Sequence, residues 1–239
     1  MSLTAYLDKG ASLGPDAPCL TSGDRSMTYG EVQRSSRLVA GALARSGVRP
    51  GDPVAVLSAN DPVAFACVFG IARAGAVWCP VNPRNEAEEN RELLDLFGCT
   101  ALLYQRAFAP LVAAVRDRLP RLTTLVCLDG DGDSGDPALE AWLAGAPEAA
   151  GTEPPDDLVL LVGTGGTTGR PKGVRLTDRN LETMTALTLM SYPFEGRPTY
   201  LALAPLTHAA GVLCFPVLAL GGEIVVMPAP DLGRFLALV

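Results

Sequence analysis

Glycine, threonine and one lysine gather in a short segment of the second half of this 239-residue chain, where they could bind phosphate. The apolar run at positions 159–162 leads into the segment. Glycine lets backbone N–H groups converge on an anion, threonine adds hydroxyl donors, and lysine adds a mobile positive charge. Pro171 restricts the backbone beside the lysine and limits its reach. The residues that we expect to contact phosphate are Thr164, Gly165, Gly166, Thr167, Thr168, Gly169 and Lys172.

Two common nucleotide-binding motifs do not fit this segment. A Walker A loop ends in Gly-Lys-Ser/Thr, whereas Lys172 follows a proline and precedes a glycine. A dinucleotide fingerprint that starts at Gly163 and Gly165 needs a third glycine where Thr168 stands. The remaining alternative is a surface turn rich in small residues. A buried strand before the segment and a Pro-Lys-Gly triplet at its end favour a phosphate site over a turn.

The overall charge limits the partners of the chain. A net charge of −7 argues against nucleic acid and anionic membranes, so phosphate binding must depend on a local site. Hydrophobic residues make up 48% of the sequence, as in ordinary globular proteins. The most apolar stretch, 209–227, is interrupted by proline, glycine and glutamate, so we expect no membrane span.

The cysteines and acidic residues favour neither a disulfide framework nor a metal site. Six scattered cysteines form no Cys-x-x-Cys pair, and most lie in apolar surroundings, which predicts buried free thiols. Asp129–Gly135 with Glu140 has the spacing of a calcium loop, but Ser134 replaces the expected glycine, so we interpret it as a solvated acidic turn. Asp8 and Lys9 interrupt any apolar signal region. We therefore expect a cytoplasmic protein.

Strand and helix patterns alternate along the chain. We expect strands at 53–57, 76–81, 101–105, 124–128, 199–204 and 223–227. We expect a helix that opens with 27–32 and runs to about 46, and further helices at about 61–74, 86–97, 108–119, 179–190 and 209–220. The helix at 61–74 is apolar on most sides and should be buried. Segment 129–157 indicates a linker or subdomain break with a short helix at 138–144. The alternation predicts an α/β fold with largely parallel sheets and helices on both faces.

The phosphate segment also carries a family resemblance. Thr164–Val174 is similar to the signature loop of the adenylate-forming enzymes, which include acyl- and aryl-CoA synthetases, firefly luciferase and peptide-synthetase adenylation domains. In that family the loop holds the phosphates of ATP while a carboxylate attacks the α-phosphate. Gly163 stands where an aromatic residue is common, and Gly165 where serine is common. Segments 27–32 and 72–84 resemble two further family motifs, which are structural.

His208, the only histidine, lies in a segment that resembles the family motif Pro-x-x-His-x-x-Gly. The resemblance implies that His208 faces the carboxylate substrate or controls its entry. A lone histidine beside an apolar helix is more often a structural residue. We favour the substrate role because the motif places His208 at a strand-to-helix junction, where α/β sheets present ligands.

The resemblance covers residues 27–227 and implies that residues 1–239 are the N-terminal part of an AMP-binding adenylation domain. Family members are longer, and the motifs for adenine, ribose and the C-terminal lysine do not occur here. The implied parent is an AMP-forming acid–thiol ligase, of the kind used in fatty acid metabolism, that takes a carboxylic acid, ATP with Mg²⁺ and CoA. The Mg²⁺ ligands would lie outside this chain, and the fragment alone would be inactive.

Two other functions remain open from the sequence. The chain could act as a non-catalytic nucleotide-binding or interaction module, for which the missing catalytic motifs argue. An NAD-dependent oxidoreductase ranks last, because it would need a glycine at position 168. Sheet edges exposed by truncation would also favour a homodimer.

Overall fold

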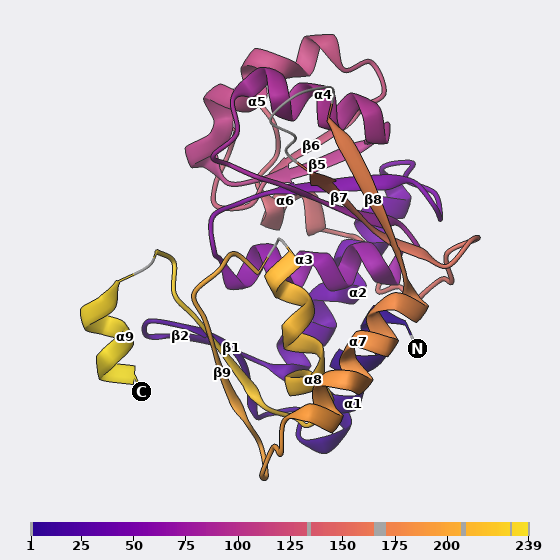
Figure 1. Ribbon diagram of the computed structural model, residues 1–239. Coiled ribbons are helices and arrows are strands. Elements are labelled where there is room, and N and C mark those ends of the chain that lie inside the picture. The colour runs from indigo at the N-terminus through magenta and orange to yellow at the C-terminus, as the bar shows by residue number, and fades with distance from the viewer. Residues whose placement is uncertain (1, 133–134, 165–170, 207–208, 230, 239) are drawn as a thin grey trace.

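The structure is a computed structural model that describes residues 2–132, 135–164, 171–206, 209–229 and 231–238 (Figure 1). The strands are β1 Pro18–Ser22, β2 Arg25–Thr28, β3 Pro53–Leu57, β4 Val77–Val81, β5 Ala101–Tyr104, β6 Thr124–Cys127, β7 Leu158–Thr164, β8 Lys172–Thr177, β9 Thr199–Ala202 and β10 Glu223–Val226. The α-helices are α1 Leu3–Leu13, α2 Tyr29–Arg45, α3 Pro62–Arg73, α4 Ala87–Phe97, α5 Ala109–Val115, α6 Leu139–Leu143, α7 Asp178–Ser191, α8 Cys214–Ala219 and α9 Leu232–Leu238.

Within these described ranges the strands form two sheets. A six-stranded sheet has the order β6-β5-β3-β4-β7-β8, and a four-stranded sheet has the order β2-β1-β10-β9. Every neighbouring pair is parallel except β7 with β8 and β1 with β2. The predicted α/β class with largely parallel sheets is confirmed.

Alternate residues of β3 show how the six-stranded sheet is covered on both faces. Val54 and Val56 pack into the core that also contains α3 and the four-stranded sheet. Ala55 and Leu57 pack into a second core with residues of α4 and α5. This period of two places helices on each side of the buried central strands of the sheet, as Figure 1 shows.

Helix α3 lies at the centre of the larger core. All of its residues are buried except the first two and one near its end, which are partly exposed, and Phe65 and Phe69 are fully buried. A Cβ atom added to Gly70 would lie 2.4 Å from Cβ of Val39. The Val39 side chain of α2 therefore packs directly against the backbone of α3. The predicted burial of this helix is confirmed.

Helix α2 begins as its sequence indicates. The Thr28 side chain accepts a hydrogen bond from the Glu31 N–H at 3.2 Å, and the Glu31 carboxylate accepts one from the Thr28 N–H at 2.7 Å. This reciprocal capping box satisfies two N–H groups that the first turn would leave unpaired. Gly47, with φ of +87°, follows the helix end.

Several elements differ from the sequence expectation. The sequence analysis assigned no element before the first helix, but α1, β1 and β2 are present there. We expected a loop to lead directly into a helix at 179, but β8 intervenes. The helices expected at 108–119 and 209–220 are interrupted by 3₁₀ turns at Arg106–Phe108, Arg116–Arg118 and Ala209–Leu213. Pro216 would lie in the interior of a helix from 209 to 220 and has no N–H to donate there, which explains why α8 begins only at Cys214.

The segment after α6 packs against the body of the molecule. The Ala149 N–H donates to the Arg37 carbonyl at 3.1 Å, and the Thr152 N–H donates to the Arg73 carbonyl at 2.9 Å. The proposed subdomain break within 129–157 stays a prediction. All six cysteines are free and buried, as the sequence predicted. No helix in the described part of the chain is both long and apolar enough to cross a membrane.

Candidate functional site

The predicted phosphate segment connects the two strands of a β-hairpin. β7 and β8 pair in antiparallel fashion, and Thr164 and Lys172 are the last partners before the connection. The Thr164 hydroxyl donates to the Lys172 carbonyl at 3.3 Å, and both residues are exposed. Gly165, Gly166, Thr167, Thr168 and Gly169 lie outside the described residues. The structure therefore places only the two ends of the candidate site, and their hairpin keeps them together.

The hairpin is anchored in the six-stranded sheet. β7 pairs with β4 in parallel through Leu160 and Trp78, and both side chains are completely buried. The connection consequently leaves the sheet at the carboxyl end of its parallel strands. Open α/β sheets bind ligands at this edge. A surface hollow of about 400 Å³ lies beside it, lined by Pro171 and by residues of α4.

Helix α4 packs directly over the base of the hairpin, across the partners Gly163 and Gly173. A Cβ atom added to Gly163 would lie 2.8 Å from Cδ2 of Leu93, and one added to Gly173 would lie 2.5 Å from Cε1 of Phe97. Leu93 and Phe97 are one helical turn apart and so face the hairpin together. The absence of a side chain at position 163 is thus matched by the close approach of α4.

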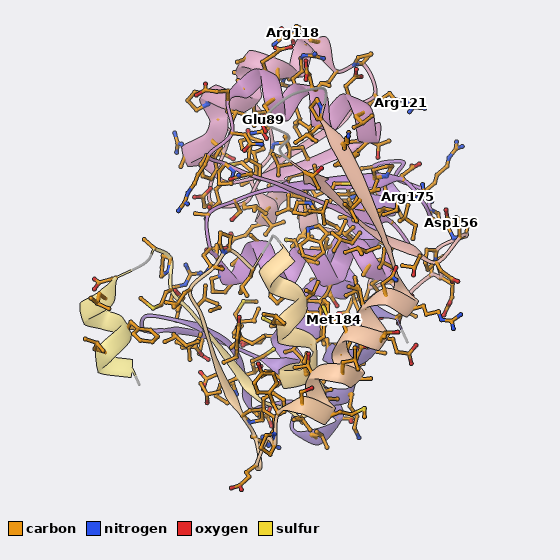
Figure 2. All side chains as sticks on the ribbon, viewed as in Figure 1. Glu89, Arg118, Arg121, Asp156, Arg175 and Met184 are labelled. Carbon is orange, nitrogen blue, oxygen red and sulfur yellow. The ribbon has the colours of Figure 1, made fainter. Side chains whose placement is uncertain are left out.

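β8 is the edge strand of its sheet and carries charge on its exposed side. Nη2 of Arg175 lies 3.1 Å from Oδ2 of Asp156, an ion pair visible in Figure 2. A charged side chain on an edge strand disfavours pairing with another chain. We attribute little stability to this pair because both side chains are more than half exposed.

The segment that contains His208 begins at a second sheet edge. Thr207 and His208 lie outside the described residues, but their neighbours are fixed. Leu206 is completely buried, and its N–H donates to Oδ1 of Asn60 at 2.9 Å. A Cβ atom added to Gly211 would lie 1.9 Å from the Leu206 carbonyl oxygen. The glycine of the Pro-x-x-His-x-x-Gly motif is therefore required for close backbone packing.

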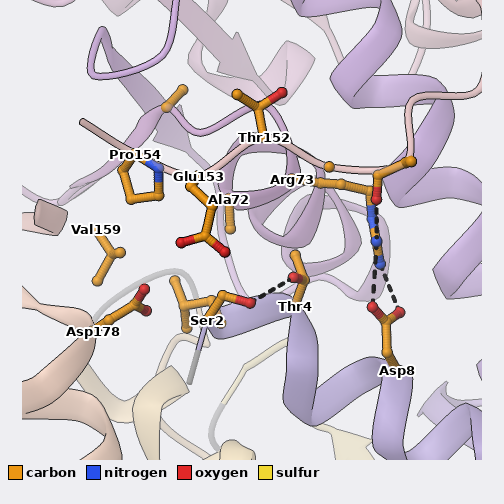
Figure 3. Close-up of a pocket in the computed structure, with 14 residues that line it drawn as sticks. Ser2, Thr4, Asp8, Ala72, Arg73, Thr152, Glu153, Pro154, Val159 and Asp178 are labelled. Carbon is orange, nitrogen blue, oxygen red and sulfur yellow. Dashed lines mark hydrogen bonds and ion pairs between the residues drawn. The ribbon is translucent and has the colours of Figure 1, made fainter. Parts of the chain in front are cut away.

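A separate polar cavity of about 240 Å³ lies between α1, α3, the 150–154 segment and the start of α7 (Figure 3). Arg73 is 4% exposed and donates to both carboxylate oxygens of Asp8, at 2.7 and 3.3 Å. Burial raises the pKa of Asp178, and the carboxylates of Asp157 and Glu153 add to the rise. Because Arg73 also donates to the Ser36 hydroxyl at 3.0 Å and to the Ala150 carbonyl at 3.1 Å, we interpret this cavity as a structural junction.

Metal binding finds little support in the described ranges. They contain no group of three or more His, Cys, Asp or Glu side chains that could hold a metal ion. Within the acidic segment at 129–135, Asp129 instead accepts the Arg106 N–H at 2.6 Å. Asp136 accepts the Tyr104 hydroxyl at 2.7 Å and lies 3.1 Å from Nη1 of Arg116.

Residues 7–239 match a family described as AMP-binding enzyme. The chain belongs to the AMP-binding enzyme family. It is 34% identical over 238 residues to a feruloyl-CoA synthase of Amycolatopsis sp., covering 96% of this chain and 44% of that protein. It is 30% identical over 236 residues to an indoleacetate–CoA ligase of Aromatoleum aromaticum, covering 97% of this chain and 46% of the relative.

The fold agrees with this membership. The N-terminal domain of FACL13 from Mycobacterium tuberculosis, solved with a bound inhibitor, superposes with a TM-score of 0.88 at 26% identity, covering 99% of this chain and 60% of that one. The relatives of this AMP-binding chain include acyl- and aryl-CoA ligases and also two peptide synthetases, tyrocidine synthase 3 and phosphinothricin tripeptide synthetase PhsC. The chain spans less than half the length of the two ligases described above.

Two parts of the site escaped the sequence analysis. Asn60 follows a buried strand, which is a position where polar residues often act, but its partners lie more than 140 residues away in the sequence. Leu93 and Phe97 look like ordinary core residues of an amphipathic helix. Their contact with two glycines on another element becomes evident only in three dimensions.

Proposed function

We propose that this chain forms the phosphate-binding part of an AMP-forming ligase that activates a carboxylic acid with ATP and transfers the acyl group to CoA. The observation that carries the proposal is the family match over residues 7–239, which includes the glycine-threonine segment between β7 and β8. The exposed position of Lys172 at the start of β8 supports a role for its ammonium group at the phosphates.

The reaction would proceed in two displacements. The carboxylate oxygen attacks the α-phosphorus of ATP and pyrophosphate leaves, and the CoA thiol then attacks the acyl carbon and AMP leaves. The first barrier arises mainly from repulsion between the carboxylate and the triphosphate. Backbone N–H groups, threonine hydroxyls and Lys172 would reduce it by neutralising phosphate charge in a fixed geometry. His208 would face the carboxylate.

Magnesium would accompany ATP, as is general in the family, and would neutralise further phosphate charge. The described residues contain no group of three or more His, Cys, Asp or Glu side chains that could hold it. The nucleophile in both displacements comes from a substrate, so the chain needs no nucleophilic side chain of its own. The cytoplasmic location, the inactivity of the fragment alone and homodimerisation stay predictions.

The relatives suggest the class of acid. Feruloyl-CoA synthase and indoleacetate–CoA ligase are both named for aromatic carboxylic acids. We therefore place aromatic acids ahead of aliphatic ones as candidate substrates of this protein.

The test measures ATP–pyrophosphate exchange by the whole protein with ferulate, indoleacetate and a long-chain fatty acid. Exchange with at least one acid is expected, and exchange with none would refute the ligase proposal. Calorimetric titration of this chain with ATP tests the loop, using Lys172→Ala and the matched control Lys9→Ala. Both substitutions remove one exposed ammonium, but Lys9 lies on α1. Binding that weakens in both variants equally would contradict a specific role for Lys172.

A further inference from the structure

Asn60 joins the ends of three strands that belong to two different sheets. It follows β3 and is 5% exposed. Its Nδ2 donates to the carbonyls of Ala202 and Met227, both at 3.0 Å. Its Oδ1 accepts the N–H of Leu206 at 2.9 Å. Both amide protons and the amide oxygen are therefore used, and each bond reaches chain that leaves β9 or β10.

The turn that carries Asn60 is itself held in place. The Ala59 N–H donates to Oε1 of Gln105 at 2.8 Å, and the Ser58 hydroxyl donates to the Ala59 carbonyl at 2.6 Å. Gln105 directly follows β5, so two strands of the six-stranded sheet support this turn. Asn60 is thus a rigid extension of that sheet and not a side chain on a free loop.

Asn60 fixes Leu206 from one side while Gly211 confines it from the other. The N–H of Leu206 is bonded to Asn60, and its carbonyl lies so close to Gly211 that no Cβ fits there. The Ala202 carbonyl also accepts the Met227 N–H at 3.1 Å, which connects the two strand ends to each other. The backbone as far as Leu206 is therefore held in a defined position relative to the sheet that carries the β7–β8 hairpin.

We propose that Asn60 is a positioning residue for the carboxylate substrate. It holds the segment that leads to His208 at a fixed position relative to the six-stranded sheet. The β7–β8 hairpin of that sheet carries the segment that would bind the ATP phosphates. This inference rests on the proposed function. Only an amide supplies two donors and one acceptor in this geometry, because aspartate lacks the donors and leucine can form none of the three hydrogen bonds.

Hydrogen–deuterium exchange of this chain tests the structural part. In Asn60→Ala we expect amide exchange at Leu206 and Met227 to accelerate by at least about tenfold. The Leu206 N–H loses its buried acceptor, and the hydrogen bond from the Met227 N–H to the Ala202 carbonyl loses the Asn60 amide that binds both residues. Asn60→Asp keeps the shape and the acceptor, so Leu206 should stay better protected than in Asn60→Ala. Tyr29→Phe is the matched control: it removes a buried 2.6 Å hydrogen bond to the Gly222 carbonyl at the opposite end of β10. Unchanged exchange at 206 and 227 would overturn the inference.

Kinetics of pyrophosphate exchange by the whole protein test the positioning role. For Asn60→Ala and Asn60→Asp we expect KM for the carboxylic acid to rise about tenfold or more while KM for ATP stays within about twofold. Tyr29→Phe should change neither. An equal effect of Asn60→Ala and Tyr29→Phe, or a rise confined to ATP, would overturn the positioning role. A wild-type protein that exchanges with no acid would instead refute the proposed function, and the amide exchange would still decide whether Asn60 joins the sheets.

Discussion

Replacing Gly173 with alanine should destabilise the protein by driving β8 and α4 apart. The added Cβ would lie 2.5 Å from Cε1 of Phe97, whereas carbon atoms in favourable contact lie about 3.5–4.0 Å apart. The ring or the strand must therefore move by about 1 Å. Gly173 has no positive φ, so the backbone itself would accept alanine without strain.

The expected magnitude combines two opposing effects. Overpacking a close-packed core costs about 1–3 kcal/mol, and we expect about 1–2 kcal/mol here because Gly173 is exposed and Phe97 is half-buried. Replacing glycine with alanine also restricts the unfolded chain, which stabilises by about 0.4–1 kcal/mol. We expect a net loss of about 1 kcal/mol in the free energy of unfolding. Because Gly173 follows Lys172 at the base of the candidate loop, the same substitution should weaken ATP binding.

Urea denaturation of a double-mutant cycle isolates the contact. The cycle comprises Gly173→Ala, Phe97→Leu and the double variant, and leucine removes the ring edge that the new methyl group meets. We expect the double variant to be more stable than the sum of the single effects by about 1 kcal/mol. Calorimetry with ATP on the same proteins shows whether restored packing also restores binding.

Two results would refute this reasoning. If Gly173→Ala stabilises the protein by about 0.4–1 kcal/mol, the substitution has only reduced the conformational entropy of the unfolded chain. In that case α4 does not confine the hairpin. If the two substitutions add within about 0.5 kcal/mol, Phe97 is not the group that alanine meets.

Three further substitutions test other parts of the structure. Burial raises the pKa of Asp178, so its ionised form opposes folding; this cost is present at neutral pH and disappears as the pH falls toward the ordinary aspartate pKa, about 3.9. Asp178→Asn should therefore raise the unfolding free energy more at pH 7 than at pH 4, as measured by urea denaturation at both values. Thr28→Ala should cost about 1 kcal/mol in the same assay, because the N–H of Glu31 loses its cap. Leu160→Ala, at a fully buried position in β7, should cost about 2–5 kcal/mol and lower the thermal midpoint in calorimetry.

Local patterns were sufficient to predict much of this fold. The run Pro53–Leu57 is apolar throughout and forms a strand covered on both faces, and helix α3 is apolar on most sides and lies between two sheets. Each prediction depends on hydrophobic content and period within a short window, which a single sequence displays directly. The family resemblance of the segment after β7 could be found in the same way, because it depends on the residue types within one short stretch of sequence.

Short and weakly apolar elements were harder to predict. β8 alternates Val174 and Leu176 with polar or small residues, a pattern that could have indicated a strand. β1 is recognisable as a strand mainly through its parallel pairing with β10, in which Leu20 faces Ile224. No local pattern contains a pairing across about two hundred residues, so the four-stranded sheet could not be derived from the sequence.

The sequence by itself determined the chemistry that is available: a glycine-threonine segment with one lysine, a single histidine, and buried strands that lead to both. Only the tertiary structure decided which distant segments contact the chain on either side of these residues. Asn60 contacts Ala202, Leu206 and Met227, and α4 contacts the glycines of the hairpin, only after the two sheets have packed around α3. Side-chain type and period are properties of a short stretch of chain, whereas hydrogen bonds and close contacts between distant segments depend on the packing of the whole core.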